Sequence, residues 1–370
     1  MTVPEKLSKT FMVANFICTI MIIAIHYNAK TAANSAQVNF NYVIMEFLTS
    51  GIARVAVPFF AMASGFFFFY DWRGFTTYKK NVKKRVRSLL IPYVIASTFI
   101  YISFVAYNFP KSGTYDFQIL TTFTDIIVHP KSVQFWFLRD LIVLTLISPL
   151  FFVNQNKMLN SILGLSLFFL WLFEVQIFPI VGGWYLLNIE TLFFFWVGAF
   201  LIREKGFLEF LLNQRPRFAA ILCSLWLGLV GVRLAIDPKF NIWYKTDFTL
   251  TSLLLYKAAI LTGLFFLFAV ASKIKSDKIL YLSGFTFFAY LFHLEPLVFF
   301  IKKITSIFVS KSMAFYFCFP LAVLFVFGMA YLMMKYIKPV YLIITGGRNP
   351  RKALSRVQLD SSTMVDPKLI

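Results

Sequence analysis

A histidine stands near the end of the first long apolar run of the sequence. The run extends from Phe11 to Asn28, and the histidine is His26. Ionisable residues are costly inside a membrane and therefore tend to mark functional sites there. An imidazole titrates near neutral pH, so His26 could remove a proton from a reacting hydroxyl group. A single histidine at a helix end is more often an interfacial residue, so the neighbours of His26 must decide between these interpretations.

Further ionisable residues interrupt later apolar runs. They are Arg54, Arg139, Asp140, Glu190, Lys257, His293 and Glu295. Because a helix rises about 1.5 Å per residue, the position of a residue within a span gives its depth. With the spans given below, all of these residues fall in the outer half of the membrane, as His26 does. Scattered charges facing lipid would be costly, so we expect these side chains to line one polar cavity.

Each of these residues also has a structural interpretation. Arg54 and Arg139 could extend their side chains to the outer headgroups. Arg139 and Asp140 are adjacent and do not share a helix face, so one of them could serve only to hold a neighbouring helix. Glu295 precedes Pro296, which we expect to kink its span, and the carboxylate could satisfy backbone groups that the proline frees. The number of ionisable residues in one layer favours a functional cavity.

A basic segment forms a second candidate site. Lys83, Lys84, Arg85 and Arg87 precede the third apolar run, which begins SLLIPY. Basic segments beside a span usually set topology and bind anionic lipid. The alternative is a site for an anionic cytoplasmic donor, because arginine pairs well with phosphate.

The composition predicts that these residues are held by membrane-spanning helices. Of the 370 residues 59% are hydrophobic and 14% are charged, and the mean hydropathy is +0.74. A soluble domain has roughly 45–50% apolar and about 25% charged residues. The chain contains 48 phenylalanines, more than one soluble core could bury. We therefore predict an all-α polytopic membrane protein without a separate soluble domain.

Ten runs approach the roughly 20 apolar residues that a membrane-spanning helix needs. They cover residues 11–28, 48–69, 89–108, 133–153, 158–178, 181–202, 217–236, 249–271, 279–301 and 312–337. Pro179, Gly182 and Gly183 divide the fifth run from the sixth. We expect residues 1–345 to form one membrane domain, and the basic segment 346–370, which has no apolar period, to be a disordered cytoplasmic tail.

The positive-inside rule gives the orientation. Ten spans place both termini on one side of the membrane, and the cytoplasmic side puts most of the Lys and Arg residues in inner segments. The segment from Asp71 to Arg87 favours this arrangement most strongly, whereas Lys302, Lys303 and Lys311 argue against it. We predict a multi-pass protein of a bacterial cytoplasmic (inner) membrane with both termini inside.

Other classes of function receive little support. The net charge of +20 does not indicate a nucleic-acid partner, because the basic residues lie in short segments between apolar runs. Cys18, Cys223 and Cys318 lie inside apolar runs and show no metal-ligand spacing, so we assign neither a disulfide nor a metal. We find no internal repeat that would indicate an inverted-repeat transporter.

Sequence blocks along nearly the whole chain resemble the acyltransferase 3 family of membrane proteins. The blocks are IMIIAIHYN, ARVAVPFFAMASGFFF at 53–68, KKRVRSLLIPY, FWFLRDLIVLTLISPL at 135–150, FWVGAFL at 195–201 and SGFTFFAYLFHLEPL at 283–297. Each block alone is a weak signal, but their order and spacing together are fairly specific. The resemblance implies about ten spans and the transfer of an acyl group, usually acetyl, from cytoplasmic acyl-CoA to a hydroxyl of a surface carbohydrate.

The resemblance also implies roles for individual residues. The family's first-helix histidine matches His26, and its basic segment before the third helix matches Lys84, Arg85 and Arg87. Family members commonly carry a basic residue eleven positions before the histidine, where this chain has Asn15. Lys9 or a residue of another helix could supply that charge, or the donor could be handled differently in this chain.

Acylation of a hydroxyl requires a base, a group that stabilises the oxyanion and the exclusion of water. His26 fits the base. Arg54 or Arg139 could stabilise the oxyanion, and Asp140 or Glu295 could orient the base or bind acceptor hydroxyls. The sequence has no nucleophile elbow and no serine beside a base, which favours direct transfer over an acyl-enzyme.

The expected partners are membrane lipid and a carbohydrate acceptor, either a surface polysaccharide or its lipid-linked repeat unit. If the donor binds at the inner basic segment, its acyl-pantetheine arm must enter the helix bundle to deliver the acyl group to the outer layer. The competing hypothesis is a transporter or flippase for a glycan or lipid-linked sugar, because the number of spans and the polar layer suit it equally.

Overall fold

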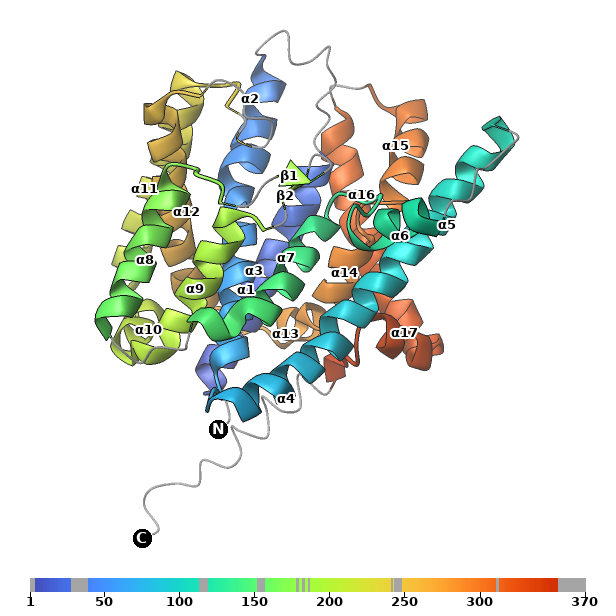
Figure 1. Cartoon of the computed structure of the whole chain (residues 1–370). Helices are drawn as coiled ribbons and strands as arrows, with labels where there is room; N and C mark the ends of the chain where they lie inside the picture. Colours follow the sequence, from blue (N-terminus) through green and yellow to red (C-terminus); the bar gives the residue numbers. More distant parts are fainter. Residues whose placement is uncertain are drawn as a thin grey trace, which may run out of the picture.

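The computed structural model describes most of the chain. The described residues are 4–27, 39–112, 119–151, 157–177, 180–181, 184–185, 187–240, 242, 248–310 and 313–351. They form a bundle of helices with a core rich in aromatic side chains (Figure 1).

Six helical segments in these ranges are long and apolar enough to cross a membrane. They are α1 (Glu5–His26), a joined segment from Phe40 to Phe69, a second from Phe75 to Asn108, α11 (Pro216–Ile236), α12 (Leu250–Ala271) and α16 (Ala314–Tyr336). The first joined segment contains α2 (Phe40–Glu46), a π-helical turn at Phe47–Gly51, a 3₁₀ turn at Ile52–Val55 and α3 (Ala56–Phe69). The second contains α4 (Phe75–Arg85), a π-helical turn at Val86–Leu90 and α5 (Ile91–Ser112). The chain is thus a helical, multi-pass membrane protein.

Three further predicted spans contain shorter helices. The span 133–153 contains α7 (Phe135–Ile147) and a 3₁₀ turn at Ser148–Phe151, and the span 158–178 contains α8 (Lys157–Leu172). The span 181–202 contains α9 (Ile189–Arg203), which follows the antiparallel pair of β1 (Ile180–Val181) and β2 (Trp184–Tyr185). Two short helices, α6 (Ile119–Ile127) and α10 (Lys205–Leu212), lie between predicted spans.

The predicted span 279–301 is broken into three helices. These are α13 (Asp277–Ser283), α14 (Thr286–Phe292) and α15 (Leu297–Phe308). We expected Pro296 to kink one continuous helix, but the chain instead leaves the helix at His293 and resumes it at Leu297. Non-helical backbone at membrane depth is tolerated where it is buried in protein or lines a cavity. Helix length therefore supports six of the ten predicted spans, and the other four remain predictions.

Close contact between α3 and α9 organises the centre of the bundle. A Cβ atom added to Gly65 would lie 2.0 Å from the carbonyl oxygen of Phe195, and one added to Gly198 would lie 2.0 Å from that of Met62. Only glycine therefore permits this approach of the two backbones, as is common between membrane helices. Phe11 of α1 packs against α3 through a stacked contact with the ring of Phe66.

One end of the bundle gathers the basic elements. The start of α1, the basic helix α4 and α17 (Lys338–Ile344) lie at this end, which is the lower end in Figure 1. Residues 346–350, the first part of the segment that we expected to be a disordered tail, pack against other helices here. Residues 352–370 of that segment lie outside the described residues.

Candidate active site

Two histidines from opposite ends of the sequence lie beside each other. His26 is the last residue of α1, and His293 is at the break that follows α14. Their ring centroids are 5.1 Å apart. His293 is completely buried, whereas His26 is partly exposed. The break in the ninth predicted span therefore brings a second imidazole to the residue that the sequence marked as a base.

The hydrogen bonds of His293 define its tautomer. Its Nδ1 lies 3.1 Å from the carbonyl oxygen of Ala289 and 2.9 Å from that of Tyr290. Carbonyl oxygens only accept hydrogen bonds, so Nδ1 carries the proton of the neutral ring and Nε2 carries the lone pair. Nε2 is buried and has no hydrogen-bonding partner among the described residues. A buried, unpaired acceptor atom is costly unless a ligand uses it.

Tyrosine side chains hold the broken segment in place. The Tyr27 hydroxyl donates to the carbonyl oxygen of His293 over 2.8 Å, and the Tyr290 hydroxyl donates to the carbonyl oxygen of Gln134. The amide of Gln134 in turn donates to the carbonyl oxygen of Leu291 over 3.3 Å. The bonds to His293 and Leu291 satisfy carbonyl groups that the interrupted helix leaves unpaired, and the bond from Tyr290 ties the segment to the start of α7.

Positive charge lies close to His26. Arg54, on the 3₁₀ turn before α3, and Lys302, on α15, both interact electrostatically with the His26 ring. Arg54 also interacts with Glu190, the first-turn carboxylate of α9. Of the two predicted oxyanion-stabilising arginines, Arg54 is thus the one that interacts with His26.

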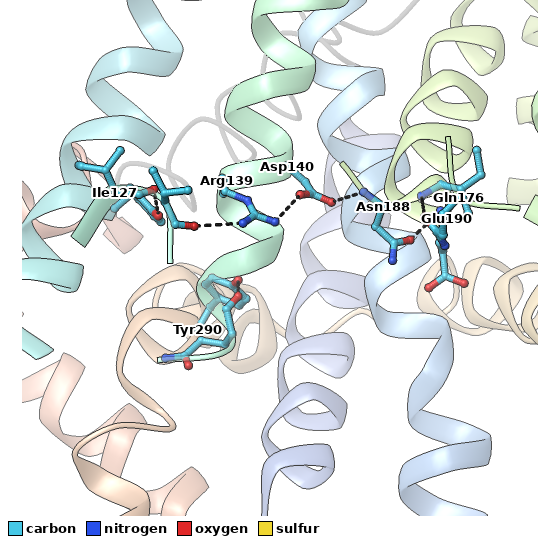
Figure 2. A network of polar contacts seen from close by, with 11 residues as sticks. Ile127, Arg139, Asp140, Gln176, Asn188, Glu190 and Tyr290 are labelled. Carbon is cyan, nitrogen blue, oxygen red and sulfur yellow. Dashed lines mark hydrogen bonds and ion pairs between the residues drawn. The ribbon is translucent and has the colours of Figure 1, made fainter. Parts of the chain in front are cut away.

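Arg139 and Asp140 bind neighbouring backbone. Arg139 donates from Nη1 to the carbonyl oxygen of Val128 over 3.1 Å, and its Nη2 lies 3.7 Å from Oδ1 of Asp140. The other oxygen of Asp140 accepts from the backbone N–H of Asn188, 2.9 Å away, at the start of α9. Figure 2 shows this row, which continues to Glu190. The pair joins α7 to α9, which matches the helix-holding interpretation.

Glu190 and Lys257 belong to a neighbouring buried cluster. Glu190 accepts from the indole N–H of Trp171 over 3.2 Å. Lys257 is completely buried, and its Nζ lies 2.5 Å from Oε2 of Glu174 and over the ring of Trp171. Lys257 lies on α12 and Glu174 follows α8, so the ion pair connects these two helices.

Glu295 follows His293 by two residues. It is partly buried and interacts electrostatically with Lys302 and Tyr27. Its carboxylate is therefore near the residues that surround His26, but no described hydrogen bond joins Glu295 to either histidine.

The predicted donor residues occupy the opposite, basic end. Lys84 and Arg87 are exposed, while Arg85 turns inward and donates from Nη2 to the carbonyl oxygen of Ser64 over 2.9 Å. The Arg85 guanidinium also lies 5.9 Å from the ring centroid of Phe68. Arg85 is thus the one of the three that enters the bundle.

Asn15 occupies the position at which family members commonly carry a basic residue, and its side chain forms a hydrogen bond. The Asn15 side chain donates to the hydroxyl of Thr286, the first residue of α14, over 3.0 Å. Lys9, the nearest basic residue along α1, pairs with Glu5 one turn earlier. Asn15 therefore connects α1 to the helix that ends beside His293.

His293 is the residue whose importance the sequence showed least clearly. We placed it in the polar layer but assigned no role to it. Its partners lie one turn earlier on its own helix and on α1, and only the fold brings the latter near.

Comparison with known proteins shows the family of the chain. A family model described as an acyltransferase domain matches residues 13–334. The chain is 23% identical over 330 residues to the succinoglycan biosynthesis protein ExoH of Rhizobium meliloti (strain 1021). The aligned region covers 84% of this chain and 83% of that protein. No solved structure matches. The matched region contains both histidines and all of the predicted site residues, and the chain belongs to the acyltransferase 3 family.

Proposed function

We propose that the protein is an O-acyltransferase that moves an acyl group from cytoplasmic acyl-CoA to a hydroxyl of a surface polysaccharide or its lipid-linked precursor. The proposed acyl group is acetyl. The family supports acyl transfer, and the similar protein from Rhizobium meliloti is named for the biosynthesis of a polysaccharide. The observation that carries the proposal is the histidine pair, in which a buried Nε2 of His293 lies beside His26.

In this mechanism His26 is the general base. It takes the proton of the acceptor hydroxyl while the oxygen attacks the thioester carbonyl. Arg54 stabilises the negative charge that develops on the carbonyl oxygen. Its electrostatic interaction with the His26 ring supports this role, because the thioester must lie beside that ring to react. The tetrahedral intermediate then collapses, the C–S bond breaks, and the thiolate of CoA takes the proton from His26. The products are the acyl ester and free CoA.

His293 assists His26 rather than replacing it. Its Nδ1 proton is engaged by backbone carbonyls, so its Nε2 is available only as an acceptor. We propose that this atom accepts a hydrogen bond from a second hydroxyl of the acceptor sugar, next to the one that is acylated, and so orients the reacting hydroxyl toward His26. A hydrogen-bond acceptor that is fixed in a site without water lowers the activation free energy more than the same group does in water.

The proposed topology has ten spans with both termini in the cytoplasm of a bacterium. The basic end of the bundle, with α4 and Arg85, then faces the acyl-CoA pool, and the histidine pair lies toward the outer side. The basic residues of α4 support this orientation through the positive-inside rule. The acyl-pantetheine arm of the donor would pass between these two regions.

Mass spectrometry of the surface polysaccharide from strains with and without the gene tests the proposal. We expect the ester-linked acyl group to disappear from a polymer that is otherwise unchanged in amount. The competing transport function predicts the opposite, namely loss of polymer from the surface with unchanged acylation of what remains. That result would refute the enzymatic assignment.

A further inference from the structure

The chain beyond the last long helix turns back into the basic end of the bundle. Helix α17 ends at Ile344, and Gly346 and Gly347 follow with φ angles of +64° and +83°. The N–H of Gly347 donates to the carbonyl oxygen of Leu342 over 2.6 Å, which closes the helix end. Side chains other than glycine rarely adopt this left-handed backbone, so the two glycines direct the chain toward α5.

Two close backbone contacts fix the returning segment. A Cβ atom on Gly346 would lie 2.7 Å from the carbonyl oxygen of Arg87 and 2.7 Å from Cα of Ser88. A Cβ atom on Gly284, between α13 and α14, would lie 2.6 Å from Cα of Pro350. The segment from Gly346 to Pro350 is therefore wedged between the basic segment of the third span and the start of α14.

Arg348 belongs to this segment, and its side chain contacts the third span and α14. Its Nη1 donates to the carbonyl oxygens of Ser88, 2.7 Å away, and Thr345, 2.6 Å away. Its guanidinium carbon lies 3.5 Å from the ring centroid of Phe287, in the first turn of α14. Stacking on an aromatic ring and fixed hydrogen bonds hold a planar guanidinium in one orientation, with edge nitrogens left for a further partner.

A second partly buried guanidinium, that of Arg85, lies near the first. Burial and the neighbouring Arg85 lower the pKa of Arg348 to about 9, so Arg348 remains a cation at neutral pH. In the described part of the chain, neither arginine forms an ion pair with a carboxylate. Two like charges held together inside a protein repel each other, and an anion between them removes that cost.

We propose that Arg348 and Arg85 form a phosphate-binding site and that Arg348, from beyond the catalytic bundle, is a donor-binding residue. Guanidinium groups match the geometry of phosphate oxygens, and the exposed Lys84 and Arg87 beside them attract a polyanion from the cytoplasm. The phosphates of acyl-CoA are the ligand that the proposed function supplies, so this inference rests on it. An anionic lipid headgroup presents the same chemistry, and the experiment below separates the two.

Helix α14 connects this site to the histidine pair. Phe287, on which Arg348 stacks, and His293 are six residues apart, a rise of about 9 Å along a helix. Thr286, the partner of Asn15, is at the same end as Phe287. A donor anchored by its phosphates at the start of α14 can extend its acyl arm along this helix toward His26.

The test measures ligand affinity of the full-length protein in nanodiscs. CoA and pantetheine, which lacks the phosphates, are titrated against the wild type and the Arg348→Ala, Arg348→Lys and Arg85→Ala variants. Arg351→Ala, an exposed arginine three residues away, is the matched control. We expect about tenfold or greater loss of CoA affinity for Arg348→Ala and Arg85→Ala, a smaller loss for Arg348→Lys, and no change for Arg351→Ala. Pantetheine binding should be the same in all variants.

Equal CoA affinity of wild type and Arg348→Ala, in discs of neutral lipid, would overturn the donor site while leaving the acyltransferase proposal intact. If Arg348→Ala does not fold, the Arg348→Lys variant decides by the same comparison. The variants could instead retain less phosphatidylglycerol in discs that contain it, with unchanged affinity for CoA. That result would assign the arginines to lipid binding and would also overturn the donor site. Binding of inorganic pyrophosphate that depends on Arg348, without any binding of CoA, would support the phosphate site and refute the acyl-CoA donor.

Discussion

Substitution of His293 by asparagine separates the two nitrogens of its ring. The Asn amide nitrogen can occupy the place of Nδ1 and keep the bonds to the carbonyl oxygens of Ala289 and Tyr290. The main polar change is the loss of the Nε2 acceptor, which has no described partner, so its removal breaks no described hydrogen bond of the folded chain. We therefore expect a stability change below about 1 kcal/mol, the typical net value of one hydrogen bond.

The effect on catalysis should be much larger. Loss of Nε2 leaves a buried hydroxyl of the bound sugar without a hydrogen-bonding partner, which costs about 1–3 kcal/mol and corresponds to roughly a 5- to 150-fold decrease in kcat. The donor binds elsewhere, so its KM should not change. The measurement is the rate of CoA release in the presence of the polysaccharide acceptor, together with thermal unfolding of the purified variant. A His293→Asn protein with wild-type kcat would refute the role of Nε2, and a large fall in thermal stability would show that His293 acts in folding instead.

Three further substitutions test the framework. Gly198→Ala should separate α3 from α9 and cost about 1–3 kcal/mol in thermal unfolding, whereas Gly228→Ala, which meets no neighbour, should be neutral or slightly stabilising; equal effects would contradict the close helix contact. Lys257→Met leaves the partly buried carboxylate of Glu174 without its cation and should destabilise the protein by about 3 kcal/mol, with recovery in a double variant that also carries Glu174→Gln. No loss of stability would show that the pair is dispensable. Arg54→Met should lower kcat about 10²-fold or more at constant affinity for CoA, while Arg54→Lys retains part of the rate; unchanged kcat would transfer the oxyanion role to another residue.

Residue types alone predicted the class of protein and marked candidate residues of the site. His26 could be recognised because an ionisable ring at the end of an apolar run is costly whatever surrounds it. The same reasoning found Arg54, since charges in an apolar run stand out without any knowledge of the fold.

Interactions between distant segments could not be predicted. The ninth predicted span is a continuous apolar run in sequence, yet it is broken at His293 because Tyr27 and Gln134, from other parts of the chain, satisfy the backbone that the break exposes. Arg348 lies in a polar segment without apolar period, and its place depends on Phe287 and Ser88. Such contacts have no local signature in the sequence.

The roles of Arg139 and Asp140 are harder to assign. Their charge within an apolar run suggested a part in the reaction, which stays a prediction, and the structure adds contacts with the backbone at Val128 and Asn188 that hold neighbouring segments. A buried charge satisfied by backbone and a buried charge that faces a substrate look the same in a sequence. Only the identity of the partner distinguishes them.

Transfer of labelled acetyl from acetyl-CoA by the reconstituted protein tests the central claim most directly. The acceptor is the host's surface polysaccharide, and the wild type is compared with His26→Ala and with His129→Ala, which removes the third histidine of the chain. We predict that the wild type and His129→Ala form an acetyl ester on the polysaccharide at similar rates, and that His26→Ala is slower by about 10²- to 10⁴-fold. Acetylation by His26→Ala at the wild-type rate would contradict the account.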